Sequence, residues 1–478
     1  MCGVIGIYNS DNVAQELYNG LLLLQHRGQD SCGILTADDE TIYLQKFKGL
    51  VSENFNEDVL STFSGRSGIA QVRYPTIGSS SLLDAQPFYL NYPLGIGMAH
   101  NGNVVNLHEL RRELKENRRV VISKCDVEVI LNVLAEELIK VSSETSNSFE
   151  KIKKAVKGVF ERINGAYSVV TVSIGNRMVA FRDPKGIRPL VMGRKKKSNG
   201  EWSYAFSSET VPLDFLGFEI VRDVKPGEVV YINSKGVVKS EVLTDDKPQH
   251  CMFEWVYFSR PDSVIENLSV YEARRNLGKQ LAHQIKEKNL SIDVVMPVPD
   301  SSRPAALACA EELGIPYREG LIKNRYSQRT FIMPTQELRE NAVKMKLSPV
   351  IKEIKGKSIL LVDDSIVRGT TSKKIVRMLK KSGAREVHFA STAPPIKKPC
   401  FYGVDMSTTE ELIAGNKSIE EIKEFIKADS LTYLSVENLK KAIPRRICTA
   451  CLDGSYPTDV EKYAEEYSEN RKQEKISQ

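Results

Sequence analysis

The sequence has no long hydrophobic run, and that absence excludes a helical membrane span. No uninterrupted apolar stretch approaches the ~18 residues that such a span needs. No charged segment with an apolar core precedes Cys2, so we find no secretory signal peptide. Internal repeats and low-complexity tracts are also missing. We therefore expect a globular, cytoplasmic protein, in which cysteines are better candidates for metal binding or catalysis than for disulfides.

The chain also lacks a strong excess of charge of either sign. Its 67 Lys and Arg residues and 61 Asp and Glu residues give a formal net charge of +6, which is small for 478 residues. This balance does not require nucleic acid, but it suits an anionic small substrate. A DNA-binding regulator would need a reading element such as a helix-turn-helix motif. We find none, so we expect no nucleic-acid partner.

The length of the chain predicts two or three domains. The stretch from Thr244 to His250 is polar and contains a proline, which places a boundary there. We predict domains over residues 2–236 and 250–440, followed by a C-terminal segment over 441–478. The end of that segment, 459–478, is charged and nearly free of large aliphatic side chains, which predicts a solvated helix or disorder.

The first domain is rich in short apolar runs bounded by Gly, Pro, Asn or Asp, a pattern typical of strands. Examples are Ala166–Ile174, Arg177–Phe181 and Gly227–Ile232. Two amphipathic stretches predict helices over Val127–Val141 and Phe149–Ile163. Strands combined with layered helices indicate an α+β sandwich.

The second domain alternates between the two kinds of element. The pattern predicts helices over Val270–Lys288, Pro304–Leu313 and Ser372–Ser382, and strands over Asp293–Val298, Lys357–Val362 and Glu386–Ser391. Such alternation is typical of an α/β domain with a parallel, doubly wound sheet.

Cys2 is the first candidate for catalysis. If Met1 is removed, one residue carries both a thiol and a free α-amine. A thiolate nucleophile needs a base, and an α-amine with a pKa of about 8 can hold the thiol's proton at neutral pH. Cys2 could also be an ordinary early residue. However, Val4, Ile5 and Ile7 predict a buried strand, which would hold this end of the chain inside the protein.

Polar clusters punctuate the rest of the first domain, at Gln25–Ser31, Arg73–Thr76, His100–Asn103 and Cys125–Asp126. Each has a plain interpretation when taken alone. The pair Asn101-Gly102 is typical of a hairpin turn, and Arg73 and Asp126 could be surface charges. Taken together with Cys2, the clusters resemble the N-terminal-nucleophile glutamine amidotransferases over roughly the first half of the chain.

That resemblance implies a role for each matching residue. Cys2 would attack the side-chain amide of glutamine, with its own α-amine as the base. The Asn101 side chain and the Gly102 backbone N–H would form the oxyanion hole. Arg73 would bind the substrate α-carboxylate, and Asp126 would accept hydrogen bonds from its α-ammonium group. Cys125 stands where the family leads us to expect a serine-like residue, which is a minor departure.

The run from Ile359 to Thr371 is the most specific motif of the second domain. A buried strand leads into Asp363 and Asp364, a short loop containing Gly369 follows, and then a helix begins. The backbone N–H groups of such a loop and the helix N-terminus bind anions. An acidic pair alone could simply cap a loop, but the whole run resembles the phosphoribosyl-diphosphate signature of type I phosphoribosyltransferases.

This second resemblance implies that the two aspartates hold the ribose hydroxyls with Mg²⁺ nearby, and that residues 365–371 surround the 5-phosphate. The stretch Lys323–Phe331, which could be only a solvated surface, matches the family's mobile loop that closes over the substrate. The residues implied to bind phosphoribosyl diphosphate are Asp363, Asp364, Ser365, Gly369, Thr370, Thr371 and Lys323, and those implied near Mg²⁺ are Ser301, Asp363 and Asp364.

The eight cysteines include one C-x-x-C pair, Cys448 and Cys451. Alone it is ambiguous among a redox pair, half a zinc site, half an iron–sulfur site and coincidence. Cys251 and Cys400 also lie in distinctive contexts, and four thiolates suit a [4Fe–4S] cluster or a zinc ion. We interpret the others, Cys32, Cys125 and Cys309, as buried structural residues.

A chain with both halves in this order resembles the amidophosphoribosyltransferase family, over nearly all of its length to about residue 457. The resemblance implies an enzyme of purine biosynthesis that makes phosphoribosylamine, diphosphate and glutamate from glutamine, phosphoribosyl diphosphate and water. Ammonia would travel from Cys2 through an internal channel. The family further implies a cytoplasmic homotetramer or homodimer and inhibition by purine nucleotides such as AMP and GMP. One subfamily holds a structural [4Fe–4S] cluster, which implies the ligands Cys251, Cys400, Cys448 and Cys451.

Two other interpretations stay open. Another glutaminase with an N-terminal cysteine, such as a hexosamine synthase or an asparagine synthetase, should lack the run 359–371. An inactive protein of this architecture could act as a scaffold, although every expected site residue is present. The size of the oligomer is open as well.

Overall fold

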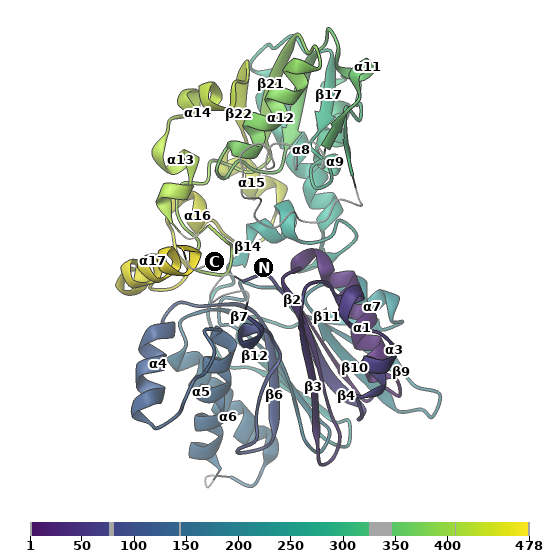
Figure 1. The fold of residues 1–478 in the computed structure, drawn as a ribbon, viewed down its shortest axis with the longest axis vertical. Coiled ribbons are helices and arrows are strands. Elements are labelled where there is room, and N and C mark those ends of the chain that lie inside the picture. Colours follow the sequence, from purple (N-terminus) through teal and green to yellow (C-terminus); the bar gives the residue numbers. More distant parts are fainter. Residues whose placement is uncertain (1, 76–80, 143–144, 325–346, 407, 477–478) are drawn as a thin grey trace.

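The structure is a computed structural model that describes residues 2–75, 81–142, 145–324, 347–406 and 408–476. Its two halves lie end to end along the long axis of the molecule (Figure 1). Antiparallel sheets form the first half and a parallel sheet forms the core of the second. Within the described ranges, no helix is both long enough and apolar enough to cross a membrane.

Two antiparallel sheets stack in the first half. One has the strand order β11 (Glu219–Asp223), β9 (Val191–Lys196), β10 (Trp202–Ser207), β1 (Gly3–Tyr8), β4 (Ser67–Arg73), β2 (Ser31–Ala37) and β3 (Ile42–Lys48). The other has the order β13 (Val238–Val242), β12 (Glu228–Ile232), β8 (Arg177–Arg182), β7 (Gly165–Ser173), β6 (Ile96–Val104) and β5 (Phe88–Leu90). Fully buried aliphatic side chains from both sheets, including Val4, Ile69, Val170 and Val230, form the core between them.

Helices cover the outer faces of this pair of sheets (Figure 1). The first sheet carries α1 (Val13–Leu24) and α7 (Thr210–Phe215), with the short α2 (Val51–Asn54) and α3 (Glu57–Ser61) nearby. The second carries α4 (Leu107–Glu116), α5 (Asp126–Val141) and α6 (Ser148–Arg162). The predicted α+β sandwich is therefore confirmed, and α5 and α6 begin and end within one residue of their predicted limits. We did not predict α1 or α4.

The central strands hold the predicted catalytic residues. Gly3, at the start of β1, pairs with Val72 in β4, so the chain enters the middle of a sheet at once. Asn101 and Gly102 lie within β6, opposite Ser168 and Tyr167 of β7, so the hairpin interpretation of this pair is wrong. At the far edge of this second sheet β13 pairs with β12, and it lies beyond the predicted limit of the first domain at residue 236.

Four parallel strands form the core of the second half, in the order β17 (Val294–Pro297), β20 (Ser358–Asp363), β21 (Glu386–Ser391) and β22 (Ser430–Tyr433). The helices around it are α8 (Val270–Lys286), α9 (Arg303–Leu313), α12 (Thr370–Lys381), α14 (Ile419–Ile426) and α15 (Val436–Ala442). Alternate residues of β20 enter two different cores, because successive side chains of a strand point to opposite faces. The predicted parallel sheet is thus confirmed.

Shorter elements complete the second half. They are the helical turn η3 (Glu254–Phe258), the pairs β14 (His250–Cys251) with β23 (Ile447–Cys448), β15 (Val264–Ile265) with β16 (Leu268–Ser269) and β18 (Leu321–Lys323) with β19 (Leu347–Pro349), and the helices α11 (Ile351–Ile354), α13 (Ile413–Asn416), α16 (Ala450–Asp453) and α17 (Glu461–Ile476). The charged tail forms α17, and the buried Tyr467 anchors it to the body of the protein.

Candidate active site

Cys2 immediately precedes β1 and is 6% exposed. Its backbone nitrogen donates a hydrogen bond to Asn101 Oδ1 at 3.3 Å. Its Sγ atom lies 3.8 Å from the carbonyl oxygen of Tyr74. The fold therefore brings the predicted nucleophile beside the predicted oxyanion residue, although 99 positions separate them in the sequence.

Asn101 and Gly102 offer two donors next to this thiol. The Nδ2 atom of Asn101 is buried and has no hydrogen-bond partner among the described residues. A buried unpaired amide is costly, so this group is poised for an acceptor that arrives with a substrate. At Gly102 a Cβ atom would lie 1.9 Å from the carbonyl oxygen of Ala166, so only glycine fits there.

Arg73 and Asp126 place opposite charges near the thiol. Arg73 ends β4 and Asp126 begins α5, and both side chains are buried. Asp126 Oδ2 accepts hydrogen bonds from His100 Nε2 at 3.3 Å and from Val104 N at 3.1 Å. Burial alone would raise the pKa of Asp126, but His100, the Val104 N–H and Arg73 outweigh it and hold the pKa below its usual value. An arginine and an ionised carboxylate can together bind the two charged groups of an α-amino acid.

The motif of the second half forms a strand, a loop and a helix. β20 ends at Asp363, and Gly369 precedes α12 with φ +72°. That conformation favours glycine, and a Cβ atom at this position would lie 2.8 Å from Ile413 Cδ1. The backbone of the loop and the start of α12 can therefore approach a phosphate closely.

Asp363 and Asp364 form a buried acidic pair. Ser302 Oγ donates to Asp363 at 3.3 Å, and Ser301 Oγ donates to Asp364 Oδ2 at 2.5 Å. Burial and then the charge of Asp364 raise the pKa of Asp363 well above its usual value, and burial also raises that of Asp364. Mg²⁺ takes oxygen ligands and shares its coordination with phosphate and water. Two desolvated carboxylates and a serine hydroxyl are a donor set that fits this ion.

One cavity of about 490 Å³ contains most of this motif and reaches the first half. The second half contributes Asp363, Asp364 and residues 367–372, and the first half contributes residues 26–29 and Tyr74. The carbonyl oxygen of Tyr74 also lies 3.8 Å from the Sγ atom of Cys2. Tyr74 therefore lies between the cavity and the nucleophile.

One described residue that is predicted to bind phosphoribosyl diphosphate does not line this cavity. Lys323 is not among the described residues that line it, and its Nζ pairs with Asp300 Oδ2 at 2.8 Å. Most of the predicted mobile loop, residues 325–331, lies outside the described residues, as does Thr76. Ser301, by contrast, lines the cavity beside the acidic pair.

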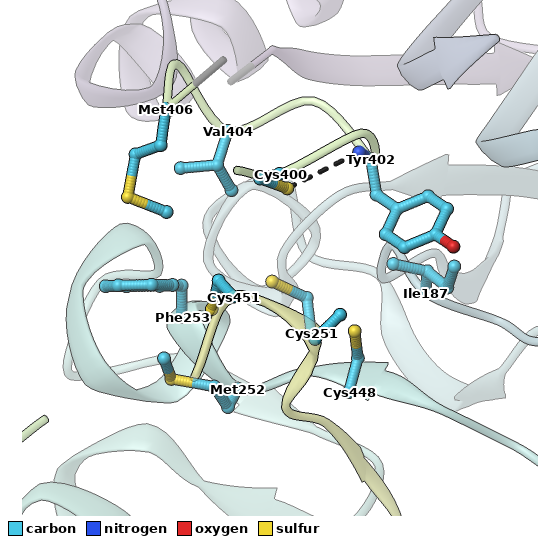
Figure 2. Close-up of a pocket in the computed structure, with 11 residues that line it drawn as sticks. Ile187, Cys251, Met252, Phe253, Cys400, Tyr402, Val404, Met406, Cys448 and Cys451 are labelled. Atoms are coloured by element: carbon cyan, nitrogen blue, oxygen red, sulfur yellow. Dashed lines mark hydrogen bonds between the residues drawn. The ribbon is translucent and has the colours of Figure 1, made fainter. Parts of the chain in front are cut away.

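Four cysteines gather around a small apolar cavity of about 10 Å³ (Figure 2). They are Cys251, Cys400, Cys448 and Cys451. The pairing of β14 with β23 places Cys251 opposite Cys448. Burial raises the pKa of Cys251 to about 11, and it also raises the pKa of Cys448 and Cys451. Thiols whose pKa is raised in this way, as in Cys251, Cys448 and Cys451, ionise only beside a cation.

The number of these thiols limits the kind of group that they could hold. Four cysteines can bind a zinc ion, with each sulfur about 2.3 Å from the metal, or an iron–sulfur cluster. Four cysteines around one apolar cavity are therefore a donor set that fits an iron–sulfur cluster. Burial raises the pKa of the other three, Cys32, Cys125 and Cys309, to about 12, as expected for structural thiols.

A buried charge network between the halves was not predicted. Arg27 Nε contacts Glu209 at 2.5 Å, and its NH2 atom contacts Glu254 at 2.6 Å. Arg188 contacts Glu254 at 3.3 Å and donates through Nε to the carbonyl of Tyr402 at 2.9 Å. In the sequence, only the polar cluster Gln25–Ser31 pointed to this network. The cluster did not indicate which residues Arg27 would contact.

The arrangement matches known proteins over its whole length. A glutamine amidotransferase domain family matches residues 76–214, and a phosphoribosyl transferase domain family matches residues 266–426. An amidophosphoribosyltransferase of Pseudomonas aeruginosa is 46% identical, with 93% of this chain and 89% of that protein covered. One of Methanocaldococcus jannaschii is 45% identical, with 96% and 98% covered. A solved structure of the glutamine phosphoribosylpyrophosphate amidotransferase of Bacillus subtilis, complexed with ADP and GMP, has a TM-score of 0.85 at 41% identity and covers 96% of this chain and 98% of that one.

Proposed function

The chain belongs to the amidophosphoribosyltransferase family, and on that basis we propose which of its residues carry out the two half-reactions. The family catalyses the first step of purine biosynthesis, in which glutamine, phosphoribosyl diphosphate and water give 5-phosphoribosylamine, diphosphate and glutamate. The observation that carries the residue assignment is the shared cavity, whose lining includes the acidic pair of one half and Tyr74 beside the nucleophile of the other.

In the glutaminase half, removal of Met1 frees the α-amine of Cys2, which accepts the thiol proton. The sulfur attacks the side-chain amide carbon of glutamine, and the carbonyl oxygen becomes an oxyanion. Asn101 Nδ2 and the Gly102 N–H stabilise that charge. The α-ammonium group then protonates the amide nitrogen, which leaves as ammonia when the C–N bond breaks, and water hydrolyses the thioester to glutamate. The unpaired Nδ2 of Asn101 supports this assignment, as do the buried opposite charges of Arg73 and Asp126.

In the phosphoribosyl half, Asp363 and Asp364 hold the ribose hydroxyls. Residues 365–371 surround the 5-phosphate, where the loop N–H groups and the hydroxyls of Ser365, Thr370 and Thr371 donate to it. Lys323 moves from Asp300 to the diphosphate. Ser301, Asp363 and Asp364 would hold Mg²⁺, which would supply positive charge to offset the charge of the leaving diphosphate. Ammonia attacks ribose C1 as the bond to diphosphate breaks.

We also propose that the chain belongs to the iron–sulfur subfamily and that Cys251, Cys400, Cys448 and Cys451 hold a structural [4Fe–4S] cluster. The shared apolar cavity and the raised pKa values of the free thiols support this proposal. The test is metal and sulfide analysis of protein purified without oxygen. A content of one metal ion per chain, or the absence of acid-labile sulfide, would contradict the proposal.

Three finer properties follow from the family. We propose a homotetramer or homodimer, with regulation by purine nucleotides such as AMP and GMP, because the Bacillus subtilis structure is described as a complex with ADP and GMP. We place the protein in the cytoplasm, since all eight of its cysteines are free thiols.

The deciding experiment measures glutamate release from glutamine by anaerobically purified protein with Mg²⁺, with and without phosphoribosyl diphosphate. We expect strong stimulation and an equal release of diphosphate, because the cavity that contains the acidic pair extends to Tyr74, whose carbonyl oxygen lies beside the Cys2 thiol. Glutamate release that is indifferent to phosphoribosyl diphosphate would instead favour a glutaminase with a different acceptor. Substitution Cys2→Ala should abolish glutamine use and leave synthesis from added ammonia intact.

A further inference from the structure

The cysteine site and the strand that carries Asn101 are joined by one segment of the chain. This segment, Cys400–Met406, is closed by a hydrogen bond from Cys400 N to the carbonyl of Met406 at 2.7 Å. The backbone N–H of Tyr402 also donates to Cys400 Sγ at 3.4 Å (Figure 2). We call it the linking segment. Its conformation depends on the position of Cys400, because both of these bonds begin or end at that residue.

Two contacts join the linking segment to β6. Asn103 Nδ2 donates to the carbonyl of Phe401 at 2.7 Å. Gly403 lies so close to Gly102 that a Cβ atom on Gly403 would be 2.9 Å from the Gly102 carbonyl oxygen. The backbone of Gly403 has φ +92°, which L side chains rarely adopt. Both contacts therefore depend on the residue types that the sequence has at these positions.

Asn103 has the placement of a positioning residue. It lies two residues from Asn101, so the two side chains point to the same face of β6. Its side chain is fully buried, and its Oδ1 has no partner among the described residues. Its amide thus acts only as a donor, to Phe401 and, at 3.3 Å, to the hydroxyl of Tyr467.

We propose that Asn103 and Gly403 are positioning residues that hold the oxyanion strand against the linking segment, so that the glutaminase site depends on how Cys400 is held. The proposal rests on the proposed roles of Cys2 and Asn101. A displacement of about 1 Å in a catalytic group can lower a rate roughly 100-fold. Arg73 and Asp126, which bind glutamine in this proposal, belong to β4 and α5 and not to the linking segment. Loss of either contact should therefore lower kcat and leave KM unchanged.

The test compares two variants with two matched controls. N103L keeps the approximate shape of the side chain and removes the donor, and G403A forces the two backbones apart. N106L removes a similar buried donor, which binds the carbonyl of Arg162 at 2.9 Å, without touching the linking segment. G200A places alanine at φ +87° where nothing lies within 4 Å. For each protein we would measure kcat and KM for glutamine, the rate at which a diazoketone analogue of glutamine labels Cys2, synthesis from ammonia, and the number of cysteines protected from a thiol reagent.

We expect N103L and G403A to lower kcat and the labelling rate about 10-fold to 100-fold. Their KM, ammonia-dependent synthesis and protected cysteines should match the wild type, as should all properties of the controls. The inference is overturned if both variants keep a wild-type kcat, or if synthesis from ammonia falls as far as glutamine use does. The variants C2A and N101A separate the two proposals: if these keep glutamine turnover, the proposed function fails first.

Discussion

At the scale of single residues, the unpaired Nδ2 of Asn101 is the most informative atom of the glutaminase half. An oxyanion donor lowers the activation barrier by about 3–4 kcal/mol. Asn101→Ala should therefore lower kcat for glutamine roughly 100-fold to 1000-fold. The KM should change little, because Asn101 meets the charge that develops in the transition state. Ammonia-dependent synthesis provides the control, and an equal loss there would mean that the substitution damages the fold instead.

The acidic pair of the second half predicts a conflict between stability and function. The pKa of Asp363 is raised, so the native state binds protons more tightly than the unfolded chain does. Stability should therefore fall as pH rises above about 4, the pKa of an unfolded aspartate. Asp363→Asn removes a buried charge and its repulsion with Asp364, and it also removes a group that holds the ribose.

We expect Asp363→Asn to raise the unfolding temperature of the substrate-free protein, by an amount that grows between pH 4 and pH 7, and to abolish synthesis from both glutamine and ammonia. Thermal unfolding across that pH range checks the first effect, and a product assay checks the second. A variant less stable than the wild type at pH 7 would contradict the assigned repulsion between the two carboxylates.

At the scale of elements, the loop between β20 and α12 depends on one glycine. Gly369 has φ +72°, and a Cβ atom there would press on Ile413 at 2.8 Å and on Phe425 at 3.2 Å. Gly369→Ala should shift the phosphate-binding loop, raise the KM for phosphoribosyl diphosphate about 10-fold and leave glutamine hydrolysis in the absence of that substrate unchanged.

Gly356→Ala is the matched control for this loop. Gly356 has φ +73°, nearly the same conformation, but nothing lies within 4 Å of the added carbon. The two variants carry similar backbone strain, but Gly356 lies in the turn between α11 and β20, so Gly356→Ala should keep the wild-type KM. A Gly369→Ala variant with the same KM as Gly356→Ala would mean that the packing of the loop against Ile413 and Phe425 does not set the affinity.

Elements with a strong local pattern were the ones that the sequence could predict. The strand β20 and the helix α12 follow from an apolar run, an acidic pair and a glycine within thirteen neighbouring positions. The helix α1 was missed because it ends in the run Leu21–Leu24, and a short continuous apolar run does not distinguish a helix from a strand. The helix α4 was missed although Leu107, Leu110 and Leu114 have helical spacing.

The candidate site was predictable where a family motif covers it, and less so where distant segments meet. Asn101-Gly102 has the local chemistry of a turn, but β7 pairs with it along the whole strand and overrides that preference. The contact of Asn103 with Phe401 joins positions 298 residues apart. No periodicity within a segment carries information about such a pair, so the linking segment could be found only in the structure.

At the scale of the whole molecule, buried ion pairs hold the two halves together. Arg27 of the first half contacts Glu254 of the second, and Arg188 contacts the same carboxylate. All three side chains are buried. Without the Glu254 carboxylate Arg188 would lose its ion-pair partner, and Arg27 would keep only Glu209. Buried charge left uncompensated in this way costs far more than the loss of an exposed pair.

We therefore predict that Glu254→Gln lowers the free energy of unfolding by about 3–5 kcal/mol. Glu219→Gln removes the partner of Arg194 from an exposed pair by the same chemical change, and it should leave the unfolding temperature near that of the wild type. Denaturant unfolding of the three proteins at pH 7 measures the difference. Equal stability of the two variants would mean that the Glu254 network contributes nothing to the junction.

The same network gives the molecule a predictable response to acid. Burial alone would raise the pKa of Glu254, but Arg27 and Arg188 outweigh it and hold that pKa below its usual value. A carboxylate with a lowered pKa stabilises the native state above the pKa of the unfolded chain, about 4.3, and this stabilisation disappears as the pH falls further. The wild type should therefore lose stability more steeply below pH 4 than Glu254→Gln does. The unfolding temperatures of the wild type and of Glu254→Gln, measured from pH 6 down to pH 3, should therefore converge. Protonation of Glu254 in the wild type removes the same charge that the substitution removes. Parallel curves would assign the acid response to other carboxylates.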